Sequence, residues 1–297
     1  MTRSAFAPRD AGMAAHVALA ACVSWVVPEA LWLPLARGIG RVLTVVPARA
    51  SGALPLDVEL AARLGCSARA LGVERTAAGH VSRLYGLREW RPWKREVPVR
   101  IDGREHHAAA LEAGAGAVLW VGRFAFASLI TKMGLHRAGV PVTHLSRPTH
   151  GFGESDFAVR WLNPSWTGIE ERFLRERIVL SPGAETAALR ALRRRLDENG
   201  VVSITVGDEA ARTVGVSVLG VPRRLATGPM HLALTGRAPL IPVFTVRDED
   251  GRFVVALEPP LDARGLTVRE ERERDLGEQY ASRLEAWVRR YPGQWLG

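Results

Sequence analysis

Three predicted strands of this chain are each followed directly by a charged residue. These residues are Arg123, Arg147 and Asp208, and the strands before them span 117–121, 141–146 and 201–206. The carboxyl ends of parallel strands meet at one edge of a sheet, where ligands bind, so we expect one crevice to collect the three side chains. A guanidinium stays protonated at physiological pH. Arg123 therefore cannot act as a base, but it can bind a phosphate or stabilise an oxyanion.

Proton transfer in this crevice needs a base other than arginine. His144 and His150 lie close to Arg147 in the sequence, and Glu209 follows Asp208 directly. The candidate catalytic residues are therefore Arg123, Asp208, Glu209, His144 and His150. Simpler roles stay open for all of them, because histidines are often hydrogen-bonded structural residues and the two acids can pair with Arg147 or Arg212.

The elements that position these residues alternate between strands and helices from Val97 onward. Short apolar runs predict strands at 117–121, 141–146, 177–181, 201–206, 239–246 and 252–258. Strands that alternate with helices indicate an α/β fold, with a largely parallel sheet flanked by helices. The chain before this core, residues 1–96, is expected to form a helical segment packed on the core of residues 97–297, so that the whole is one structural unit.

Sequence signals bound several of the expected helices. Apolar residues recur at three- and four-residue steps between 188 and 196, and Asn199-Gly200 is a typical helix stop. Thr227 is a suitable N-cap for a helix that ends at Gly236, and a last helix is expected over about 268–290. Other helices are expected at 12–27, 29–46 and 57–85, with a connection at 45–55.

Five further residues are candidates for substrate binding: Arg147, Ser128, Arg212, Thr227 and Gly228. Arg147 suits a phosphate or a headgroup, and the free N–H groups at the start of the Thr227 helix suit an anion. Simple pairing of Arg147 with Asp208, and simple capping by Thr227, remain alternatives. No metal site is expected: His106 and His107 lack partners at a ligand spacing and are assigned to a loop after Gly103.

The apolar run from Ala14 to Val27 has two interpretations. It is shorter than the roughly 20 residues that a membrane-spanning helix needs. The N-terminal helices can simply pack on the domain, or Trp25 and Trp32 with their aliphatic neighbours can rest on a membrane interface.

Composition limits the partners and the compartment. The chain has 297 residues, a formal charge of +9, and only two lysines, Lys94 and Lys132, so that almost every positive side chain is an arginine. Guanidinium groups suit phosphorylated or carboxylate partners. No nucleic acid is expected, because the arginines are not grouped with aromatic residues. Only two cysteines occur, which fits a reducing cytoplasm.

The block around Arg123 resembles one found in the bacterial lysophospholipid acyltransferase-like family, most closely in its lipid A late acyltransferase branch. There a strand runs into His-Phe-Gly-Asn-Trp-Glu, where this chain has Arg123-Phe124-Ala125-Phe126-Ala127-Ser128. In the family the histidine is the base and the acid orients it. Arg123 and Ser128 stand at those two positions here.

Four other segments resemble the family in the same order. They are Ser146–Pro148, similar to Tyr-Arg-Pro; Val206–Glu209, similar to a Pro-Asp-Gln turn; Ala226–Phe244, similar to Thr-x-Gly-Pro-x-x-Leu-Ala followed by Ala-Pro-Val-Val-Pro-Val-Phe; and Tyr291–Leu296, similar to His-Pro-Glu-Gln-Trp-Leu. The resemblance implies a glycerolipid acyltransferase-like fold.

The resemblance also implies acyl transfer from a thioester to a hydroxyl or amine. It requires no cofactor, and acyl-CoA or an acyl-carrier protein is the expected thioester co-substrate and partner. The expected location is the cytoplasm, at the inner face of the membrane if the N-terminal helices contact it. Because Arg123 and Ser128 replace the usual pair, two other functions stay open: an inactive relative that binds an acyl chain, lipid or partner, and a biosynthetic enzyme with a different transfer reaction in the same crevice.

Overall fold

The computed structural model describes residues 8–43, 55–181, 183–208, 210–263 and 265–297. Its centre is a seven-stranded sheet in the order β1-β9-β8-β2-β5-β3-β4. The strands are β1 Val99–Asp102, β2 Ala117–Val121, β3 Val142–Ser146, β4 Glu176–Val179, β5 Val201–Thr205, β8 Leu240–Arg247 and β9 Phe253–Leu257. All six strands predicted from the sequence are present in it.

Strand direction follows the predicted pattern. Within the described chain, every neighbouring pair of this sheet is parallel except β8 and β9. The strands β8, β2, β5, β3 and β4 therefore share one direction, and β9 and β1 run the other way. Every residue of β2 and β9 is buried, which requires cover on both faces of the sheet. The predicted fold class, a largely parallel sheet flanked by helices, is confirmed.

Helices connect and cover these strands. They are α5 Arg104–Glu112, α6 Ala127–Arg137, α7 Asn163–Glu171, α8 Glu185–Asp197, α9 Gly228–Gly236 and α10 Arg269–Arg290, and a π-helical turn, Ala158–Leu162, precedes α7. Asn199 has a φ of 57° directly after the end of α8, as the predicted stop signal requires. The assignment of His106 and His107 to a loop is wrong, because both lie in α5, which begins after the left-handed Gly103.

A two-stranded hairpin stands outside the main sheet and was not predicted. Its strands, β6 Thr213–Val218 and β7 Val221–Ala226, are antiparallel, and β6 packs against α10. The turn consists of Leu219 and Gly220, both with positive φ. Tight hairpins of this kind usually have Asn-Gly at the turn, and a leucine with positive φ is uncommon. Because Leu219 stands where asparagine is usual, the sequence carried no signal of the hairpin.

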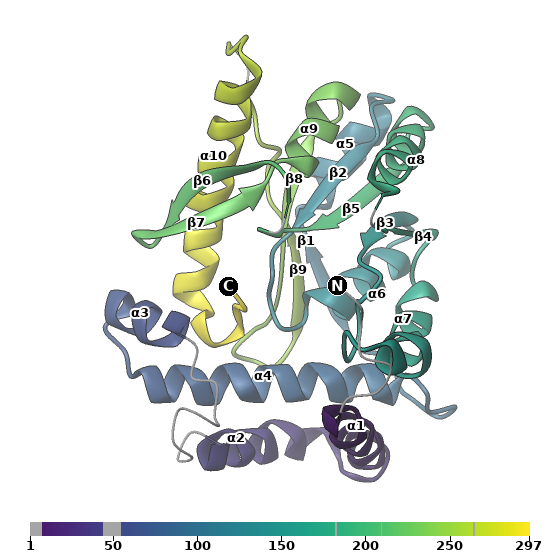
Figure 1. Ribbon diagram of the computed structural model, residues 1–297, viewed down its shortest axis with the longest axis vertical. Coiled ribbons are helices and arrows are strands. Elements are labelled where there is room, and N and C mark those ends of the chain that lie inside the picture. Colours follow the sequence, from purple (N-terminus) through teal and green to yellow (C-terminus); the bar gives the residue numbers. More distant parts are fainter. Residues whose placement is uncertain (1–7, 44–54, 182, 209, 264) are drawn as a thin grey trace.

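The N-terminal segment forms a helical layer across one end of the sheet (Figure 1). Its elements are α1 Pro8–Val26, a short turn at Glu29–Leu31, α2 Trp32–Leu43, α3 Pro55–Leu64 and α4 Ala68–Arg88. α4 lies next to the sheet, and α1 and α2 pack on its other side. The boundary drawn at residues 96 and 97 stays a prediction.

Two expectations for this layer need correction. The helix predicted over 57–85 is two helices, because Gly65 adopts a φ of 65° and Ser67 caps the start of α4 by accepting from the backbone N–H of Ala70. The predicted connection at 45–55 lies, up to residue 54, outside the described residues. Trp32 is buried and donates its indole N–H to the carbonyl of Val27 at 3.0 Å, so it does not face a membrane.

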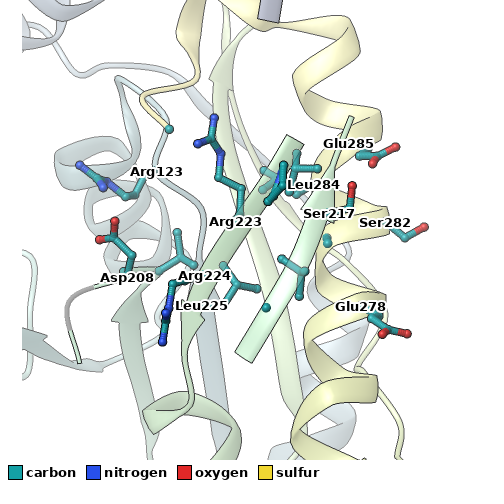
Figure 2. A pocket seen from close by; sticks show the side chains of 18 of the residues that line it. Arg123, Asp208, Ser217, Arg223, Arg224, Leu225, Glu278, Ser282, Leu284 and Glu285 are labelled. Atoms are coloured by element: carbon teal, nitrogen blue, oxygen red, sulfur yellow. The ribbon is translucent and has the colours of Figure 1, made fainter. Parts of the chain in front are cut away.

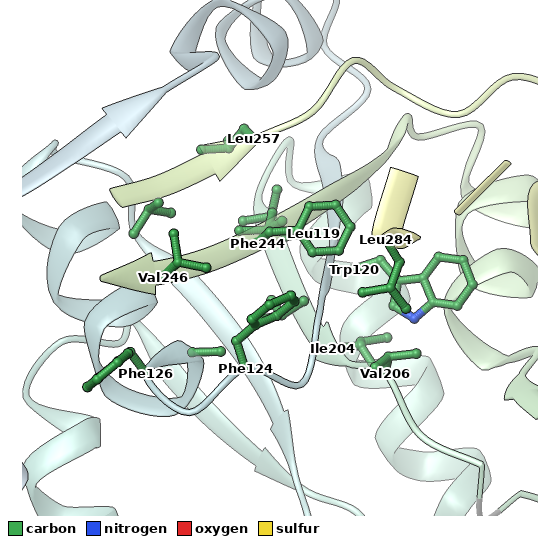
Figure 3. Packing of buried hydrophobic residues seen from close by; sticks show 14 of the residues in the cluster. Leu119, Trp120, Phe124, Phe126, Ile204, Val206, Phe244, Val246, Leu257 and Leu284 are labelled. Carbon is green, nitrogen blue, oxygen red and sulfur yellow. The ribbon is translucent and has the colours of Figure 1, made fainter. Parts of the chain in front are cut away.

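The hydrophobic core joins the sheet to α10 and to the turn after β2 (Figure 3). Trp120 on β2 packs on Tyr280 of α10 with ring centroids 4.0 Å apart, and Phe244 of β8 contacts both Tyr280 and Phe124. Among the helices that the structure describes, none has the length and apolar character needed to cross a membrane.

Candidate active site

A cavity of about 1060 Å³ opens beside the end of β2 (Figure 2). Arg123 and Asp208 lie at one end of it, and acidic side chains of α10 lie at the other. Between them the walls come from the end of β5, the β6–β7 hairpin and α10. Arg223 and Arg224 of β7 stand there among mostly apolar side chains: Val206, Val216, Val218, Leu225, Ala281 and Leu284. The unpredicted hairpin therefore supplies much of the cavity.

The backbone around Arg123 is held by the C-terminal end of the chain. The N–H of Ala125 donates to the carbonyl of Gln294 at 2.7 Å, and the N–H of Leu296 donates to the carbonyl of Arg123 at 2.8 Å. Phe124 and Trp295 form an antiparallel bridge in the same place. These bonds fix the backbone at Arg123, whose side chain is exposed at one end of the cavity.

Of the three charged residues expected in one crevice, Arg123 and Asp208 line the cavity and Arg147 does not. Arg147, which follows β3, has its guanidinium against Gly207, where a Cβ would lie 3.4 Å from its Nη2. Gly207 and Asp208 follow β5 and line the cavity together with Arg123. Within the described residues, the guanidinium of Arg123 forms no ion pair. Glu209, the other predicted acid, lies outside the described residues.

The remaining predicted binding residues are held by other contacts. Arg212 reaches two glutamates of α10, Glu270 at 3.4 Å and Glu273 at 3.2 Å. Thr227 and Gly228 stand at the start of α9 as predicted, but the Thr227 hydroxyl does not cap the helix: it donates to the carbonyl of Arg212 at 3.4 Å. Their roles in binding stay predictions.

His144 lies inside the sheet layer and not at its edge. It occupies the middle of β3, is buried, and its Nδ1 is 2.8 Å from the hydroxyl of Ser203 on β5. Burial lowers the pKa of its imidazole well below the ordinary value, and the positive charge of Lys132 lowers it further. His144 is therefore a neutral, hydrogen-bonded interior histidine, whereas His150 is in a different environment.

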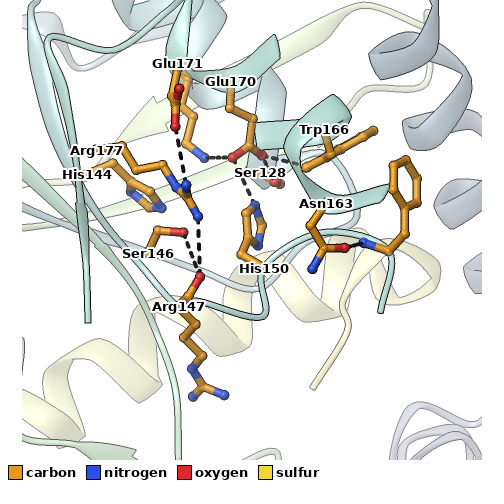
Figure 4. A network of polar contacts seen from close by, with 12 residues as sticks. Ser128, His144, Ser146, Arg147, His150, Asn163, Trp166, Glu170, Glu171 and Arg177 are labelled. Carbon is orange, nitrogen blue, oxygen red and sulfur yellow. Dashed lines mark hydrogen bonds and ion pairs between the residues drawn. The ribbon is translucent and has the colours of Figure 1, made fainter. Parts of the chain in front are cut away.

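His150 belongs to a polar cluster centred on Glu170 of α7 (Figure 4). One carboxylate oxygen, Oε2, accepts from Lys132 Nζ at 2.6 Å and from His150 Nε2 at 2.9 Å. The other, Oε1, accepts from the Ser128 hydroxyl and from Trp166 Nε1 at 2.9 Å. Ser128 thus contacts a carboxylate that is supplied by a distant helix. We call these five residues the Glu170 cluster.

Glu170 is ionised in this cluster although it is 1% exposed. Burial by itself would raise the pKa of its carboxyl group, but the charge of Lys132 and the hydrogen bonds from His150 and Lys132 hold that pKa well below its ordinary value. Four donors for one buried carboxylate leave none of its strong acceptor sites unused. The carboxylate is thus the centre of a connected polar network, of which His150 is a partly exposed member.

Sequence reasoning missed Glu170 and Lys132. Each is a charged residue on an otherwise buried helix face: Glu170 follows Trp166 and Ile169 on α7, and Lys132 stands between Ile130 and Met133 on α6. The signal in the sequence was a charged residue on the apolar face of a helix. A charged side chain is seldom buried without a partner, so each of these two residues indicated a partner elsewhere in the fold. Among the residues that the structure describes, no group of three or more His, Cys, Asp or Glu side chains could hold a metal ion.

A sequence profile of the bacterial lipid A biosynthesis acyltransferase family matches residues 87–296, which is well over half of the chain. The chain belongs to this family. The match begins in the last turn of α4 and includes the whole sheet, the cavity and the Glu170 cluster, so the candidate active site of this lipid A acyltransferase family member lies within it.

Other comparisons add little. Comparison of this acyltransferase family member with curated proteins found no match. Among solved structures, the 1-acyl-sn-glycerophosphate (LPA) acyltransferase PlsC from Thermotoga maritima is similar at 12% identity, over 85% of this chain and 97% of that one, with a TM-score of 0.38.

Proposed function

We propose that this protein transfers an acyl group from a thioester donor to a hydroxyl or amine acceptor at the cavity beside Arg123. The observation that carries the proposal is the position of Arg123 at one end of a cavity of about 1060 Å³ whose walls are largely apolar. An acyl chain suits such walls, and a carbonyl at the Arg123 end develops negative charge when it is attacked. A guanidinium there would stabilise that oxyanion.

The donor is proposed to be acyl-CoA or an acyl-carrier protein. Both present the thioester on a phosphate-bearing arm, and arginine side chains are suited to phosphate. Arg147 and the two arginines of β7, Arg223 and Arg224, lie at or beside the cavity. These positive side chains would bind the phosphates of the donor, while its acyl chain occupies the apolar part of the cavity.

The test is thioester consumption by the purified protein. Acyl-CoA and acyl-carrier donors of several chain lengths are offered with hydroxyl and amine acceptors, and the released thiol is measured. Arg123→Ala should lower kcat by about 100- to 1000-fold, the usual effect of losing one oxyanion donor. Arg190→Ala, at an exposed position of α8, is the matched control and should leave the rate unchanged.

Two results would contradict acyl transfer. If acyl-CoA binds but no donor is consumed with any acceptor, the protein is a binding relative. If Arg123→Ala and Arg190→Ala have equal rates, transfer occurs elsewhere on the molecule.

We also propose that the N-terminal helices contact a membrane surface. Large apolar side chains of α1, the turn after it and α2 are exposed: Leu19, Trp25, Val26, Leu31, Leu35, Ile39 and Val42. Helix α2 has two faces. Trp32 and Ala36, four residues apart, are buried, whereas Leu35 and Ile39, also four residues apart, are exposed. An interfacial helix buries such a face among lipid headgroups and acyl chains.

A further inference from the structure

His150 is held by a buried carboxylate through one ring nitrogen only. Its Nε2 is 2.9 Å from Glu170 Oε2, and the imidazole is 30% exposed. Within the described part of the chain, Nδ1 of His150 has no hydrogen-bond partner. A carboxylate can only accept, so the proton of the neutral ring must be on Nε2. The lone pair is therefore on Nδ1, the nitrogen that Glu170 does not occupy.

Lys132 supplies the cation that pairs with Glu170. Its ammonium is buried and 2.6 Å from Glu170, so the two charges cancel before His150 is counted. A neutral imidazole satisfies the remaining acceptor position of Oε2 without adding a third charge. The cluster thus orients His150 through a carboxylate whose charge is already balanced by Lys132.

The loop that carries His150 is fixed to the same helix as Glu170. Buried Asn163 at the start of α7 accepts from the N–H groups of Phe152 and Gly153 at 2.7 and 3.1 Å. Its amide nitrogen donates to the carbonyls of Gly153 and Thr149. These four bonds hold the loop on both sides of His150, so the ring is pre-organised and does not need to be ordered by a ligand.

The cluster lies at the sheet edge that carries the cavity. His150 is three residues after Arg147, and its backbone N–H donates to the carbonyl of Arg147 at 3.1 Å. On the other side, Glu170 accepts from Ser128, in the first turn of the helix that follows Arg123. The Glu170 cluster therefore lies at the carboxyl ends of β2 and β3, the edge of the sheet where the cavity opens, although none of its five residues lines that cavity.

We infer that His150 is the general base of the proposed acyl transfer, that Glu170 is its positioning residue, and that the acceptor approaches from the Nδ1 side. Nδ1 takes the proton from the acceptor hydroxyl or amine as the acceptor's oxygen or nitrogen bonds to the thioester carbonyl carbon. The carbon–sulfur bond then breaks, and the imidazolium returns the proton to the leaving thiolate. The inference rests on the proposed function and assigns it a base.

The tautomer of His150 is measured first, by nitrogen-15 NMR of the unmodified protein with labelled histidine. His150→Gln identifies the resonances of this ring by their loss. The expected result is that the neutral form of the ring carries its proton on Nε2. A neutral form with its proton on Nδ1 would overturn the assignment of the base.

Kinetics of His150→Gln test the base itself. The glutamine amide can still donate to Glu170, but an amide is too weak a base to take a proton from the acceptor. We expect kcat to fall by about 100- to 10,000-fold with KM within about twofold, and the loss of activity toward acid pH to disappear from the profile. His136→Gln, at an exposed site on α6, is the control and should leave kcat and the profile as in the unmodified protein.

The outcomes separate the two proposals. If the unmodified protein consumes no thioester, the proposed function fails and the base with it. If it is active and His150→Gln retains kcat, only the base is overturned. Glu170→Gln tests positioning: a mixture of both ring tautomers and a reduced kcat are expected, and an unchanged tautomer would exclude that role.

Discussion

Replacing Lys132 by methionine should reveal how strongly the Glu170 cluster depends on charge balance. Lys132 and Glu170 are 2.6 Å apart, and both are buried. Methionine fills the space of the lysine stem but carries no charge. Glu170 would then be an uncompensated buried carboxylate, and breaking a buried pair in this way costs about 3–5 kcal/mol of unfolding free energy.

A double-mutant cycle separates the pair from its surroundings. Urea unfolding at pH 7 is measured for Lys132→Met, Glu170→Gln and the two together. The double variant should lose less stability than the sum of the single variants, with a coupling of about 1.5–3 kcal/mol. The other lysine, Lys94, has a side chain that is 34% exposed and lies 3.5 Å from Glu89; Lys94→Met should cost less than about 1 kcal/mol.

The same variants give a pH signature. The pKa of Glu170 is lower in the folded protein than the ordinary value of 4.5, so its contribution to stability is present above that pH. That contribution is lost as the pH falls from about 4.5 toward the folded value, and the acid side of the stability profile should be less steep in Glu170→Gln. Additive single effects together with an unchanged acid side would refute the coupling.

Two other changes test the loop beside the cluster and the N-terminal layer. Gly151 has a φ of 141°, and a Cβ there would lie 2.6 Å from the buried Asn163 amide, so Gly151→Ala should lower the free energy of unfolding by about 1–3 kcal/mol. Gly168→Ala on α7 meets no atom within 4 Å and should change it by less than about 1 kcal/mol; equal effects would contradict the contact. Leu35→Glu with Ile39→Glu, both on the exposed face of α2, should weaken sedimentation with phosphatidylglycerol vesicles by about tenfold or more while leaving the unfolding midpoint unchanged. Unaltered vesicle binding would contradict membrane contact through α2.

The fold could be predicted where one local pattern was sufficient. Strand β2 has the predicted bounds because five consecutive buried apolar residues end at a glycine. Helix α8 ends where Asn199-Gly200 indicated. Prediction failed where the outcome depended on backbone conformation at one or two residues. Gly65 divides a continuous helical pattern, and Leu219 forms a hairpin turn without the usual turn residues.

The candidate site also has a part that the sequence predicted and a part that it did not. Arg123 and Asp208 could be placed at one cavity from the sequence, because the carboxyl ends of parallel strands lie at one edge of the sheet. The apolar walls could not, because they come from a hairpin and from one face of α10. His150 was one of several histidines until Glu170 distinguished it from the interior His144.

The sequence by itself determined the alternation of strands and helices, the family, and the charged residues that leave the strand ends, since all of these depend on short-range periodicity and motif order. Only the tertiary structure decided that Glu170 of α7 meets Lys132 of α6 and His150 of the loop between β3 and α7. Lys132 and Glu170 are 38 residues apart, and no local pattern links them. Packing of α7 on α6 buries the carboxylate, and a buried carboxylate is stable only where the fold supplies a cation and hydrogen-bond donors to it.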